Sequence, residues 1–510
     1  MIRDLRNGLR VFSLVRILAR HDALFVFDHI DAARLLVLVL RPFVRRRPGR
    51  PGEKLARALQ DAGPSFIKLG QALASRSDLL GEQIAADLSQ LMDRLPPFPF
   101  DEVRTTIEDE FDRPLEELFR SFDEEPVAAA SIAQVHFAVD AEGREVAVKV
   151  LRPGIEAAFD RDLDLFFWVG ERVEIHLPML RRLRLVESVA ILADAVGREM
   201  DLRFEAAAAT ELAENFTGDP SFHVPVVDWT RTGKRVLTTQ RVSGIKIDER
   251  EAIIAAGHDP HRVLAQATEA FFNQVFRDGF FHGDLHAGNL FVRDDGGIAA
   301  VDFGIMGRLD RATRRHLGEM LLAFLSRDYR RAAEVHFEAG WVPADQSLDA
   351  FAQACRSIAE PILDKPQSEI SIARLLGHLF RVTKTFAMET QPQLLLLQKT
   401  MLVAEGTGRK LAPDANMWLL ARPLIESWTA DTFGPEARIR ETVGELASTI
   451  ARVPELVRRA ERGFAAVVDG YLRIHPESLR ELRGRGGRSS FAGWLVAAVL
   501  AGIVVGMFLR

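Results

Sequence analysis

Hydrophobic and polar positions alternate with two different periods along this chain. In residues 128–151 (AAASIAQVHFAVDAEGREVAVKVL), apolar residues recur at every second position around a turn at DAEG. A period of two predicts a hairpin of two or three strands, whose last strand places its valines on one face and Lys149 on the other. KRVLTTQRVSG (234–244) predicts either a further strand pair or one strand leading into a hinge.

A helical period governs most of the remaining chain. A helix is expected at 64–80, and a second one follows it up to about residue 95. Further helices are expected at 101–111, with Asp101 as the N-cap, and from Pro114 onward. Residues 156–216 and most of the chain after residue 260 are also expected to be helical. Two short strands, LFV (290–292) and IAAVDFG (298–304), interrupt the last region and are joined at DDGG. The chain is therefore predicted to be an α+β protein.

The order of these patterns divides the chain into five parts. They are a basic amphipathic segment (1–50), a helical extension (51–122), a first lobe with a helical insert (123–242), a mostly helical second lobe (243–483) and an apolar tail (491–509). A small antiparallel sheet followed by a larger helical half is the order of a two-lobed, protein-kinase-like fold.

The apolar tail, FAGWLVAAVLAGIVVGMFL, is predicted to be a transmembrane helix. Its 19 residues carry no charge, and at ~1.5 Å per residue they span about 28 Å, the thickness of a bilayer core. A buried core helix would normally show a polar stripe. Arg483, Arg485 and Arg488 precede the tail and Arg510 alone follows it, which predicts an anchor whose preceding body faces the cytoplasm.

Two further features of the ends leave alternatives open. Ala498, Gly502 and Gly506 recur every four residues, a spacing that allows a homodimer through packed helices but is also common in single spans. Residues 1–50 hold eleven arginines and four aspartates. This segment either lies on anionic lipid or packs as a solvated helix on the protein.

Composition excludes several classes of protein. The 510 residues are 47% hydrophobic and 27% charged, with a net charge of −6, so no basic excess indicates nucleic-acid binding. Cys355 is the single cysteine. It excludes a disulfide framework and any multi-cysteine metal site, and it favours a reducing compartment.

The segment HGDLHAGNLFV (282–292) carries the candidate chemistry. Asp284 and Asn289 are five residues apart, and Asp302 of D-F-G follows thirteen residues later. Phosphoryl transfer requires a carboxylate near the acceptor and oxygen ligands for Mg²⁺, and H-x-D-x-x-x-x-N followed by D-F-G has the protein-kinase spacing. We expect Asp284 to position water or an acceptor hydroxyl, and Asn289 and Asp302 to hold Mg²⁺.

A zinc site is the alternative for this segment, because His282 and His286 have the i, i+4 spacing of helical ligands. Gly283 and Gly288 argue against a helix here. We therefore expect His282 to brace the loop through hydrogen bonds and His286 to line the site.

A nucleotide site also needs a cation for the α- and β-phosphates. Lys149 of VAVKV matches the strand lysine of kinases, although an ordinary exposed strand lysine has the same appearance. Its acidic partner is expected in GREMDLRFEAAA. Glu199 and Glu205 would lie about 240° apart on one continuous helix, so they cannot both face Lys149. We expect Glu205 to pair with Lys149.

An alanine-rich loop stands where protein kinases have a glycine-rich one. It comprises Ala128, Ala129, Ala130 and Ser131. Each alanine keeps a Cβ, so either nucleotide binding is altered or the loop is a strand edge. After Gly304 there is no A-P-E sequence and little room for an activation segment, which argues against a conventional protein kinase.

These motifs together resemble the UbiB family of atypical protein-kinase-like proteins. The matching stretches are FIKLGQALASR, AAASIAQVH, VAVKVLRPG, the E-x-D motif at 199–201, HGDLHAGN, VDFG and EGTGRKLAPDAN, between about residues 50 and 420. The resemblance implies a kinase-like fold with an N-terminal helical extension, binding of ATP and Mg²⁺, and membrane association. It also implies a requirement in ubiquinone biosynthesis, and hence polyprenylphenol intermediates and other enzymes of that route as partners at the bacterial inner membrane.

Bacterial relatives have long been linked to 2-polyprenylphenol 6-hydroxylation. Since nothing here looks like a flavin or iron hydroxylase site, that role is read as supportive.

The resemblance also assigns a role to the K-x-G-Q helix. Lys68 and Gln71 lie three apart and share one helix face; without the resemblance they read as a solvent-facing pair. In the family this motif blocks the place of a peptide, and its lysine meets the E-x-D acid, here Glu199, with Asp201 completing the motif. Bacterial relatives often show two C-terminal spans, whereas one is expected here.

Three hypotheses about function follow. The first is a membrane-anchored kinase-like ATPase that supports quinone synthesis. The second is a small-molecule or lipid kinase, because HGD also occurs in aminoglycoside- and choline-kinase-like enzymes. The third is a nucleotide-binding scaffold without phosphotransfer. The K-x-G-Q helix and the apolar tail argue against the second, and the complete Lys/Asp/Asn/Asp set argues against the third.

Overall fold

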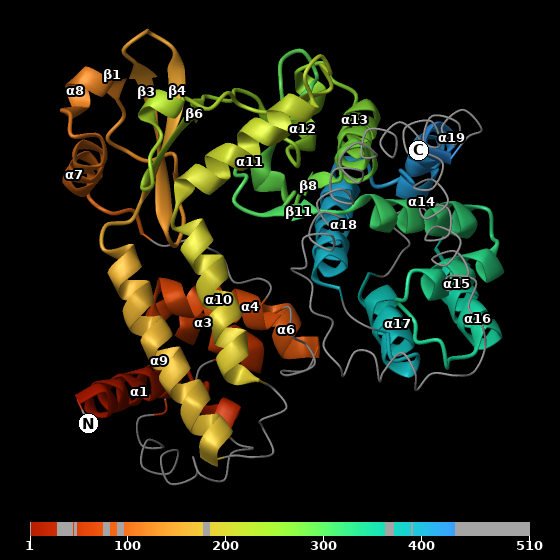
Figure 1. The fold of residues 1–510 in the computed structure, drawn as a ribbon. Coiled ribbons are helices and arrows are strands. Elements are labelled where there is room, and N and C mark those ends of the chain that lie inside the picture. The colour runs from red at the N-terminus through yellow and green to blue at the C-terminus, as the bar shows by residue number, and fades with distance from the viewer. Residues whose placement is uncertain are drawn as a thin grey trace, which may run out of the picture. The chain divides into compact units, whose positions relative to one another are not determined.

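The computed structural model describes residues 2–27, 44, 48–74, 82–88, 96–176, 184–362, 372–388 and 391–433 (Figure 1). The chain divides into two compact units, residues 1–429 and 430–510. The membrane helix predicted at 491–509 lies outside the described residues. Of the helices described, none is both long and apolar enough to cross a bilayer.

Helices and sheets combine in a protein-kinase-like α+β fold. The helices are α1 (Ile2–Arg20), η1 (Leu24–Phe27), α3 (Pro51–Ala62), α4 (Pro64–Ala74), α6 (Glu82–Leu88), α7 (Phe100–Phe111), α8 (Leu115–Leu118), α9 (Ile155–His176), α10 (Leu185–Glu199), α11 (Leu202–Asn215), η5 (Trp229–Arg231), α12 (Arg250–Ala255), α13 (Pro260–Phe272), η6 (Asn273–Asp278), η7 (Ala287–Asn289), α14 (Arg311–Leu325), α15 (Tyr329–Glu338), α16 (Leu348–Ala359), α17 (Ile372–Thr385), α18 (Pro392–Leu411) and α19 (Met417–Phe433). The strands are β1 (Phe119–Phe122), β2 (Ala128–Ala129), β3 (Ala133–Asp140), β4 (Glu145–Leu151), β5 (Phe222–His223), β6 (Val236–Gln240), β7 (Ile245–Lys246), β8 (Phe280–His282), β9 (Leu290–Val292), β10 (Ile298–Ala300) and β11 (Met306–Arg308).

The first lobe is built on an antiparallel sheet in the order β1-β3-β4-β6, with β2 on β3. The hairpin predicted from the period of two is confirmed, and β3 and β4 pair from Ala133↔Leu151 to Val139↔Glu145. The valines of β4 are buried against α7 and α8, in a cluster with Val103, Ile107 and Leu118. Because side chains alternate across a strand, Lys149 is placed on the opposite face.

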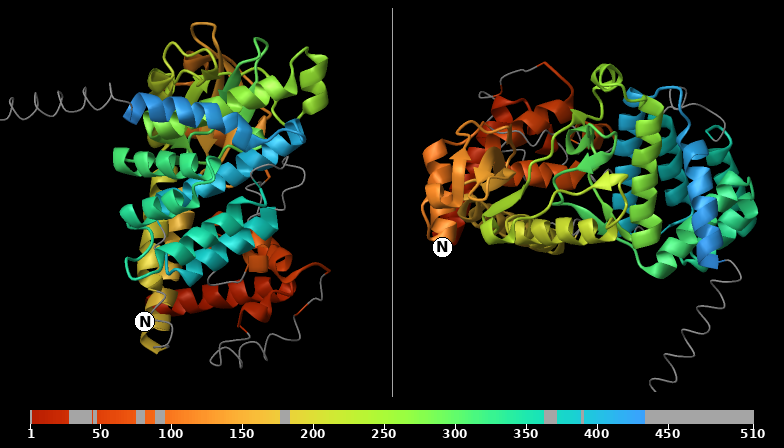
Figure 2. Two further views of the ribbon diagram at one scale, coloured as in Figure 1. Left: turned by 90° about the vertical axis from the view of Figure 1, so that its right-hand side faces the viewer. Right: turned by 90° about the horizontal axis from the view of Figure 1, so that it is seen from above.

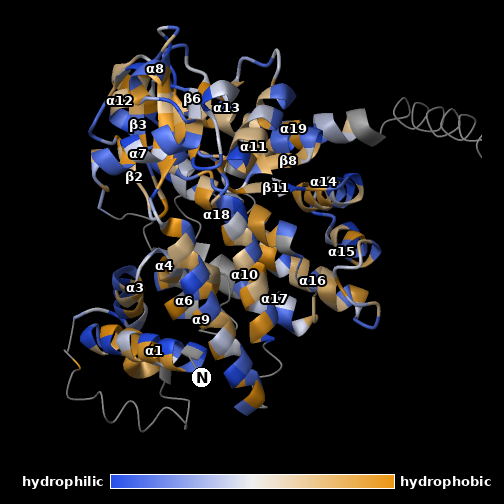
Figure 3. Ribbon diagram, turned by 60° about the vertical axis from the view of Figure 1, so that its left-hand side comes forward, coloured by the Kyte–Doolittle hydropathy of each residue, from blue (hydrophilic) through white to orange (hydrophobic). Residues whose placement is uncertain are grey.

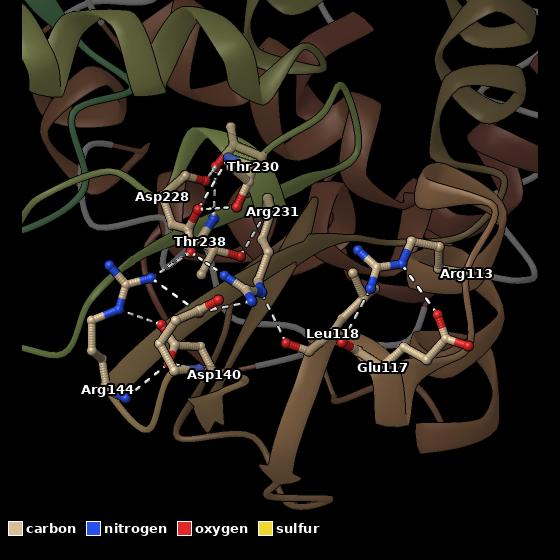
Figure 4. Close-up of polar contacts among 11 residues, drawn as sticks. Arg113, Glu117, Leu118, Asp140, Arg144, Asp228, Thr230, Arg231 and Thr238 are labelled. Carbon is tan, nitrogen blue, oxygen red and sulfur yellow. Dashed lines mark hydrogen bonds and ion pairs between the residues drawn. The ribbon is translucent and has the colours of Figure 1, made fainter.

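A buried arginine joins the edge of this sheet to the neighbouring loops (Figure 4). Arg231 donates from Nε to the carbonyl oxygen of Leu118 over 2.8 Å and from Nη1 to Oδ2 of Asp228 over 2.6 Å. Its own carbonyl oxygen accepts from the Thr238 hydroxyl on β6 over 2.7 Å. These hydrogen bonds satisfy the donors of the Arg231 guanidinium, so its charge can be buried without an unpaired group.

Two inserted helices, α9 and α10, separate strand β4 from helix α11. They extend from the sheet towards α1, α3 and α4 (Figure 1). Phe66 of α4 and Phe166 of α9 meet edge to face, with ring centroids 5.1 Å apart, in a core shared with α1 and α3. The insert therefore provides the surface on which the N-terminal extension packs.

The second lobe is mostly helical. Its short sheets have the orders β5-β10-β9-β7 and β11-β8. The two strands predicted around DDGG are found as β9 and β10, which pair antiparallel. β10 ends at Ala300, so the second strand is shorter than the predicted 298–304. The helices after residue 310, green to blue in Figure 2, pack side by side around a phenylalanine-rich core.

Several predicted boundaries need correction. Asp101 is not the N-cap of α7, because the helix begins at Phe100 after Pro99. Asp101 lies in the first turn, where the helix dipole still stabilises its carboxylate. Residues 156–216 contain three helices, α9, α10 and α11. The break between α10 and α11 falls at Met200, and Asp201 caps α11 through the Arg203 N–H. Of the two alternatives for 234–244, the single strand β6 is found.

Candidate active site

Buried hydrogen bonds hold the segment HGDLHAGN as it leaves strand β8. The backbone N–H of His282 donates to Oε1 of Gln274 over 2.9 Å. Gln274 lies in η6, a π-helical turn of the kind that often occurs at functional sites. The N–H of Asp284 donates to Nδ1 of His282 over 3.0 Å, and Nε2 of the same ring lies 3.4 Å from the carbonyl oxygen of Val301.

This geometry makes His282 a structural brace. Nδ1 accepts a hydrogen bond, so the proton of the ring is on Nε2, and burial lowers the pKa of His282 and keeps the ring neutral. His286 is half exposed; its Nδ1 accepts from the Gly288 N–H, and its Nε2 lies 3.9 Å from Oδ2 of Asp284. Within the described parts of the chain, no group of three or more His, Cys, Asp and Glu residues is arranged to hold a metal.

Asn289 connects the segment HGDLHAGN (282–289), called the catalytic segment below for its predicted role, to the residues that precede Asp302. Its Nδ2 donates to the carbonyl oxygen of Asp284 over 3.0 Å, which fixes the side-chain amide. Its own carbonyl oxygen accepts from the Val301 N–H over 2.9 Å. These two bonds bring Asp284, Asn289 and the residue before Asp302 to one place.

Asp302 has a left-handed backbone, with φ of +64°. For a residue other than glycine this conformation costs on the order of 1–3 kcal/mol, and such strain clusters at functional sites. Its side chain is 52% exposed, and Oδ1 lies 3.1 Å from Nζ of Lys149. The positive charge of Lys149 holds the pKa of Asp302 well below its usual range, so this carboxyl is ionised.

Lys149 and Glu205 form the pair that the sequence predicted. Nζ of Lys149 lies 2.9 Å from each carboxylate oxygen of Glu205 on α11. Burial opposes the charge of Lys149, but the two carboxylates beside it outweigh burial and raise its pKa. Burial, together with the nearby charge of Asp302, raises the pKa of Glu205 to about 7 against the opposing effect of Lys149.

The alanine-rich loop is a tight edge of the first-lobe sheet. Ala128 and Ala129 pair with β3, and the Ala130 N–H donates to the carbonyl oxygen of Ala133 over 2.8 Å. Ser131 is fully buried, and in the described part of the chain its hydroxyl has no hydrogen-bond partner. The loop is thus a strand edge by geometry, while its role in nucleotide binding stays a prediction.

The K-x-G-Q and E-x-D motifs meet through one pair of residues. Nζ of Lys68 on α4 lies 2.8 Å from Oε2 of Glu199 at the end of α10, and both side chains are largely buried. Gln71 lies one turn further along α4 and is partly buried. Asp201 turns instead to Arg203, whose guanidinium lowers the pKa of the Asp201 carboxyl.

Two residues of α18 at the site were missed from the sequence. The Thr400 hydroxyl donates to the carbonyl oxygen of Gly283 over 2.9 Å, and Nζ of Lys399 lies 3.7 Å from Oδ1 of Asp284. Both follow a run of four leucines, LLLLQKT, more than a hundred residues after Asp284. Polar residues between this leucine run and the apolar MLV that follows were the available signal in the sequence.

Comparison with known proteins decides the family. The ABC1 atypical kinase-like domain matches residues 90–336, and the UbiB helical domain matches residues 355–416. A protein of Marinobacter nauticus named "Probable protein kinase UbiB" is 42% identical over 456 residues, covering 88% of this chain and 83% of its own. This chain belongs to the UbiB family.

A second relative matches nearly the whole chain. A protein of the same name from Xanthomonas euvesicatoria is 38% identical over 522 residues, covering 97% of this chain and 94% of its own. Among solved structures, the Rv3197–erythromycin complex of Mycobacterium tuberculosis covers 78% of this chain and 98% of its own, with a TM-score of 0.49 and 24% identity. In this UbiB-family chain, the kinase-like domain contains Lys149, Asp284, Asn289 and Asp302.

The donor set of the site suits ATP and Mg²⁺. Mg²⁺ takes oxygen ligands and is commonly held by one or two carboxylates together with substrate phosphates; the ionised Asp302 and the side-chain oxygen of Asn289 match that requirement. When bound, the metal would neutralise charge on the phosphates. Lys149 would bind the α- and β-phosphates, and Glu205 would orient it. By the spacing of its motif, Asp284 would be the carboxylate that accepts a proton from the nucleophile.

Proposed function

We propose that this UbiB-family protein is an ATP- and Mg²⁺-dependent kinase-like ATPase or phosphotransferase that supports ubiquinone biosynthesis. One observation carries this proposal: Lys149 of the first lobe contacts Glu205 and Asp302 together, beside the loop that holds Asp284 and Asn289. Each group required for phosphoryl transfer is therefore present at one site. Relatives named as UbiB protein kinases support the same assignment.

The chemical step would be transfer of the terminal phosphoryl group of ATP to water or to an acceptor hydroxyl. Asp284 would orient the nucleophile and accept its proton. The stage that this activity supports is polyprenylphenol hydroxylation, with polyprenylphenol intermediates and other enzymes of ubiquinone biosynthesis as partners. The hydroxylation itself would belong to a partner, since the site carries the groups of phosphoryl transfer.

We further propose that the protein acts at the bacterial inner membrane, anchored by residues 491–509 with its kinase-like body on the cytoplasmic side. Helix α1 supports contact with lipid. Leu5, Leu9 and Phe12 share one face of α1 and are 68%, 66% and 50% exposed, while its opposite face packs on the extension. Polar and apolar residues alternate along this helix in Figure 3. Exposed apolar side chains beside arginines are typical of helices that lie on anionic lipid.

A vesicle assay tests the proposal. The full-length protein in detergent is expected to hydrolyse ATP slowly, and vesicles containing anionic lipid are expected to accelerate the reaction. Neutral vesicles serve as the control for surface alone. If Asp302→Asn hydrolyses ATP at the rate of the unmodified protein in all three settings, the proposed metal site is wrong.

A further inference from the structure

Helix α18 reaches the catalytic segment from outside the kinase-like domain. It belongs to the UbiB helical domain matched at 355–416, whereas the catalytic segment belongs to the domain matched at 90–336. The fully buried Thr400 fixes the contact, because its hydroxyl donates to the carbonyl oxygen of Gly283 over 2.9 Å. A Cβ at Gly283 would lie 3.0 Å from Cδ1 of Leu396. Gly283 therefore leaves room for the side chain of Leu396 on α18 as well as for Ile305.

The anchor at Thr400 places Lys399 beside the catalytic carboxylate. Nζ of Lys399 lies 3.7 Å from Oδ1 of Asp284, and the lysine side chain is 57% exposed. Among the described lysines and arginines, Lys399 is the one within 4 Å of Asp284. A half-exposed ammonium in a loose ion pair keeps donors available for another anion.

The charge balance of the site calls for such a cation. The charge of Lys149 is already matched by Glu205 and Asp302. The terminal phosphoryl group would bring further negative charge next to Asp284, where two anions repel each other. Enzymes of phosphoryl transfer commonly answer this with a cation from a separate element or a separate protein.

We propose that Lys399 contacts the terminal phosphoryl group of ATP and stabilises the charge that develops on it during transfer. This inference rests on the proposed function and adds a residue from the helical domain to the site. In the step, the oxygen of water or of an acceptor hydroxyl bonds to the terminal phosphorus. The bond from that phosphorus to the β–γ bridging oxygen breaks, and ADP leaves with its electron pair. The proton of the nucleophile passes to Asp284, and Lys399 exchanges no proton.

Nucleotide affinities test this contact without relying on turnover. Calorimetric titration of the full-length protein with Mg²⁺ and either ADP or a non-hydrolysable ATP analogue gives the ratio of the two affinities. Lys399→Ala and Lys399→Gln are expected to lower the affinity for the ATP analogue about tenfold. The affinity for ADP should not change, because ADP lacks the terminal phosphoryl group. Lys399→Arg keeps the charge and is expected to retain most of the preference.

Lys410→Ala is the matched control on the same helix. Lys410 is also exposed, and its Nζ lies 3.1 Å from Oδ2 of Asp248, away from Asp284. This variant is expected to keep the affinity ratio of the unmodified protein. Thermal melting of all three Lys399 variants checks that they fold, which the exposure of the side chain favours.

ATP hydrolysis separates this inference from the proposed function. Where the unmodified protein hydrolyses ATP, Lys399→Ala is expected to lower kcat by about 10²–10³-fold, as for removal of one group that stabilises developing charge. An absence of hydrolysis by the unmodified protein would exclude the ATPase form of the proposed function and leave the affinity ratio as the test of Lys399. An unchanged ratio in Lys399→Ala and Lys399→Gln would overturn the inference.

Discussion

Nζ of Lys68 lies 2.8 Å from Oε2 of Glu199, and this ion pair joins the N-terminal extension to the kinase-like domain. Glu199 is the last residue of α10, and α11, which carries Glu205, begins three residues later. The K-x-G-Q helix is therefore connected within a few residues to the acid that holds Lys149. The extension and the nucleotide site are parts of one arrangement.

Breaking this pair is expected to destabilise the protein. Lys68→Met leaves the largely buried carboxylate of Glu199 without that partner, and the expected loss is about 1–3 kcal/mol. Glu199→Gln should cost a similar amount. Because the two residues interact directly, the double variant should lose less than the sum of the single losses, and thermal melting measures all three. Strictly additive losses would show that the contact contributes nothing.

The Lys149–Glu205 pair predicts a pH dependence of nucleotide binding. The pKa of Glu205 is raised to about 7, so the carboxyl becomes protonated as pH falls through about 7 and loses its charge towards Lys149. Affinity for Mg²⁺ and ATP is therefore expected to fall between about pH 8 and pH 6. Glu205→Gln, which is uncharged throughout, should flatten this dependence. A dependence that persists unaltered in Glu205→Gln would assign it to another group.

Gly283 provides a test of the packing around the segment HGDLHAGN, against both Ile305 and α18. A Cβ there would lie 2.8 Å from Cγ2 of Ile305 and 3.0 Å from the Ile305 carbonyl oxygen. Gly283→Ala is therefore expected to cost about 1–3 kcal/mol and to reduce ATP hydrolysis. Gly406→Ala is the matched control, because that position of α18 has no atom within 4 Å of an added Cβ. It should stabilise the helix by up to about 1 kcal/mol. Equal melting temperatures of the two variants would contradict the packing account.

Asp302→Asn separates charge from backbone geometry at the proposed metal site. Asparagine tolerates the left-handed conformation found at Asp302, so this substitution adds little strain. The amide keeps the shape of the side chain and removes its charge. We expect the Mg²⁺ dependence of ATP binding to be lost, as measured by titration with and without the metal. Mg²⁺ dependence equal to that of the unmodified protein would exclude Asp302 as a ligand.

Local signals in the sequence predicted much of the site. Alternation in β4 placed Lys149 opposite the buried valines. The glycines beside His282 correctly predicted that the segment from His282 to His286 is not helical. The helix expected to carry both Glu199 and Glu205 is interrupted between them. Asp201, a residue of the E-x-D motif, is also the N-cap at which α11 begins as a separate helix. The pairing with Glu205 was still predicted.

What escaped prediction depends on contacts between distant segments. Lys399 is placed by the hydrogen bond of Thr400 to the catalytic segment, and no spacing along the chain encodes which helix of the second lobe packs there. The anchoring of α4 on α9 through Phe66 and Phe166 is likewise a tertiary contact. Periodicity indicates which face of a helix is buried, but not the partner that covers it.

The quinone content of a deletion strain tests the central claim most directly. A bacterial strain lacking this gene is complemented with the unmodified gene, with Asp284→Asn or with the control Lys410→Ala, and ubiquinone and its polyprenylphenol precursors are measured at equal protein levels. We expect the unmodified gene and Lys410→Ala to restore ubiquinone, and Asp284→Asn to leave a precursor accumulating. Full restoration of ubiquinone by Asp284→Asn would contradict a phosphoryl-transfer role and favour a nucleotide-binding scaffold.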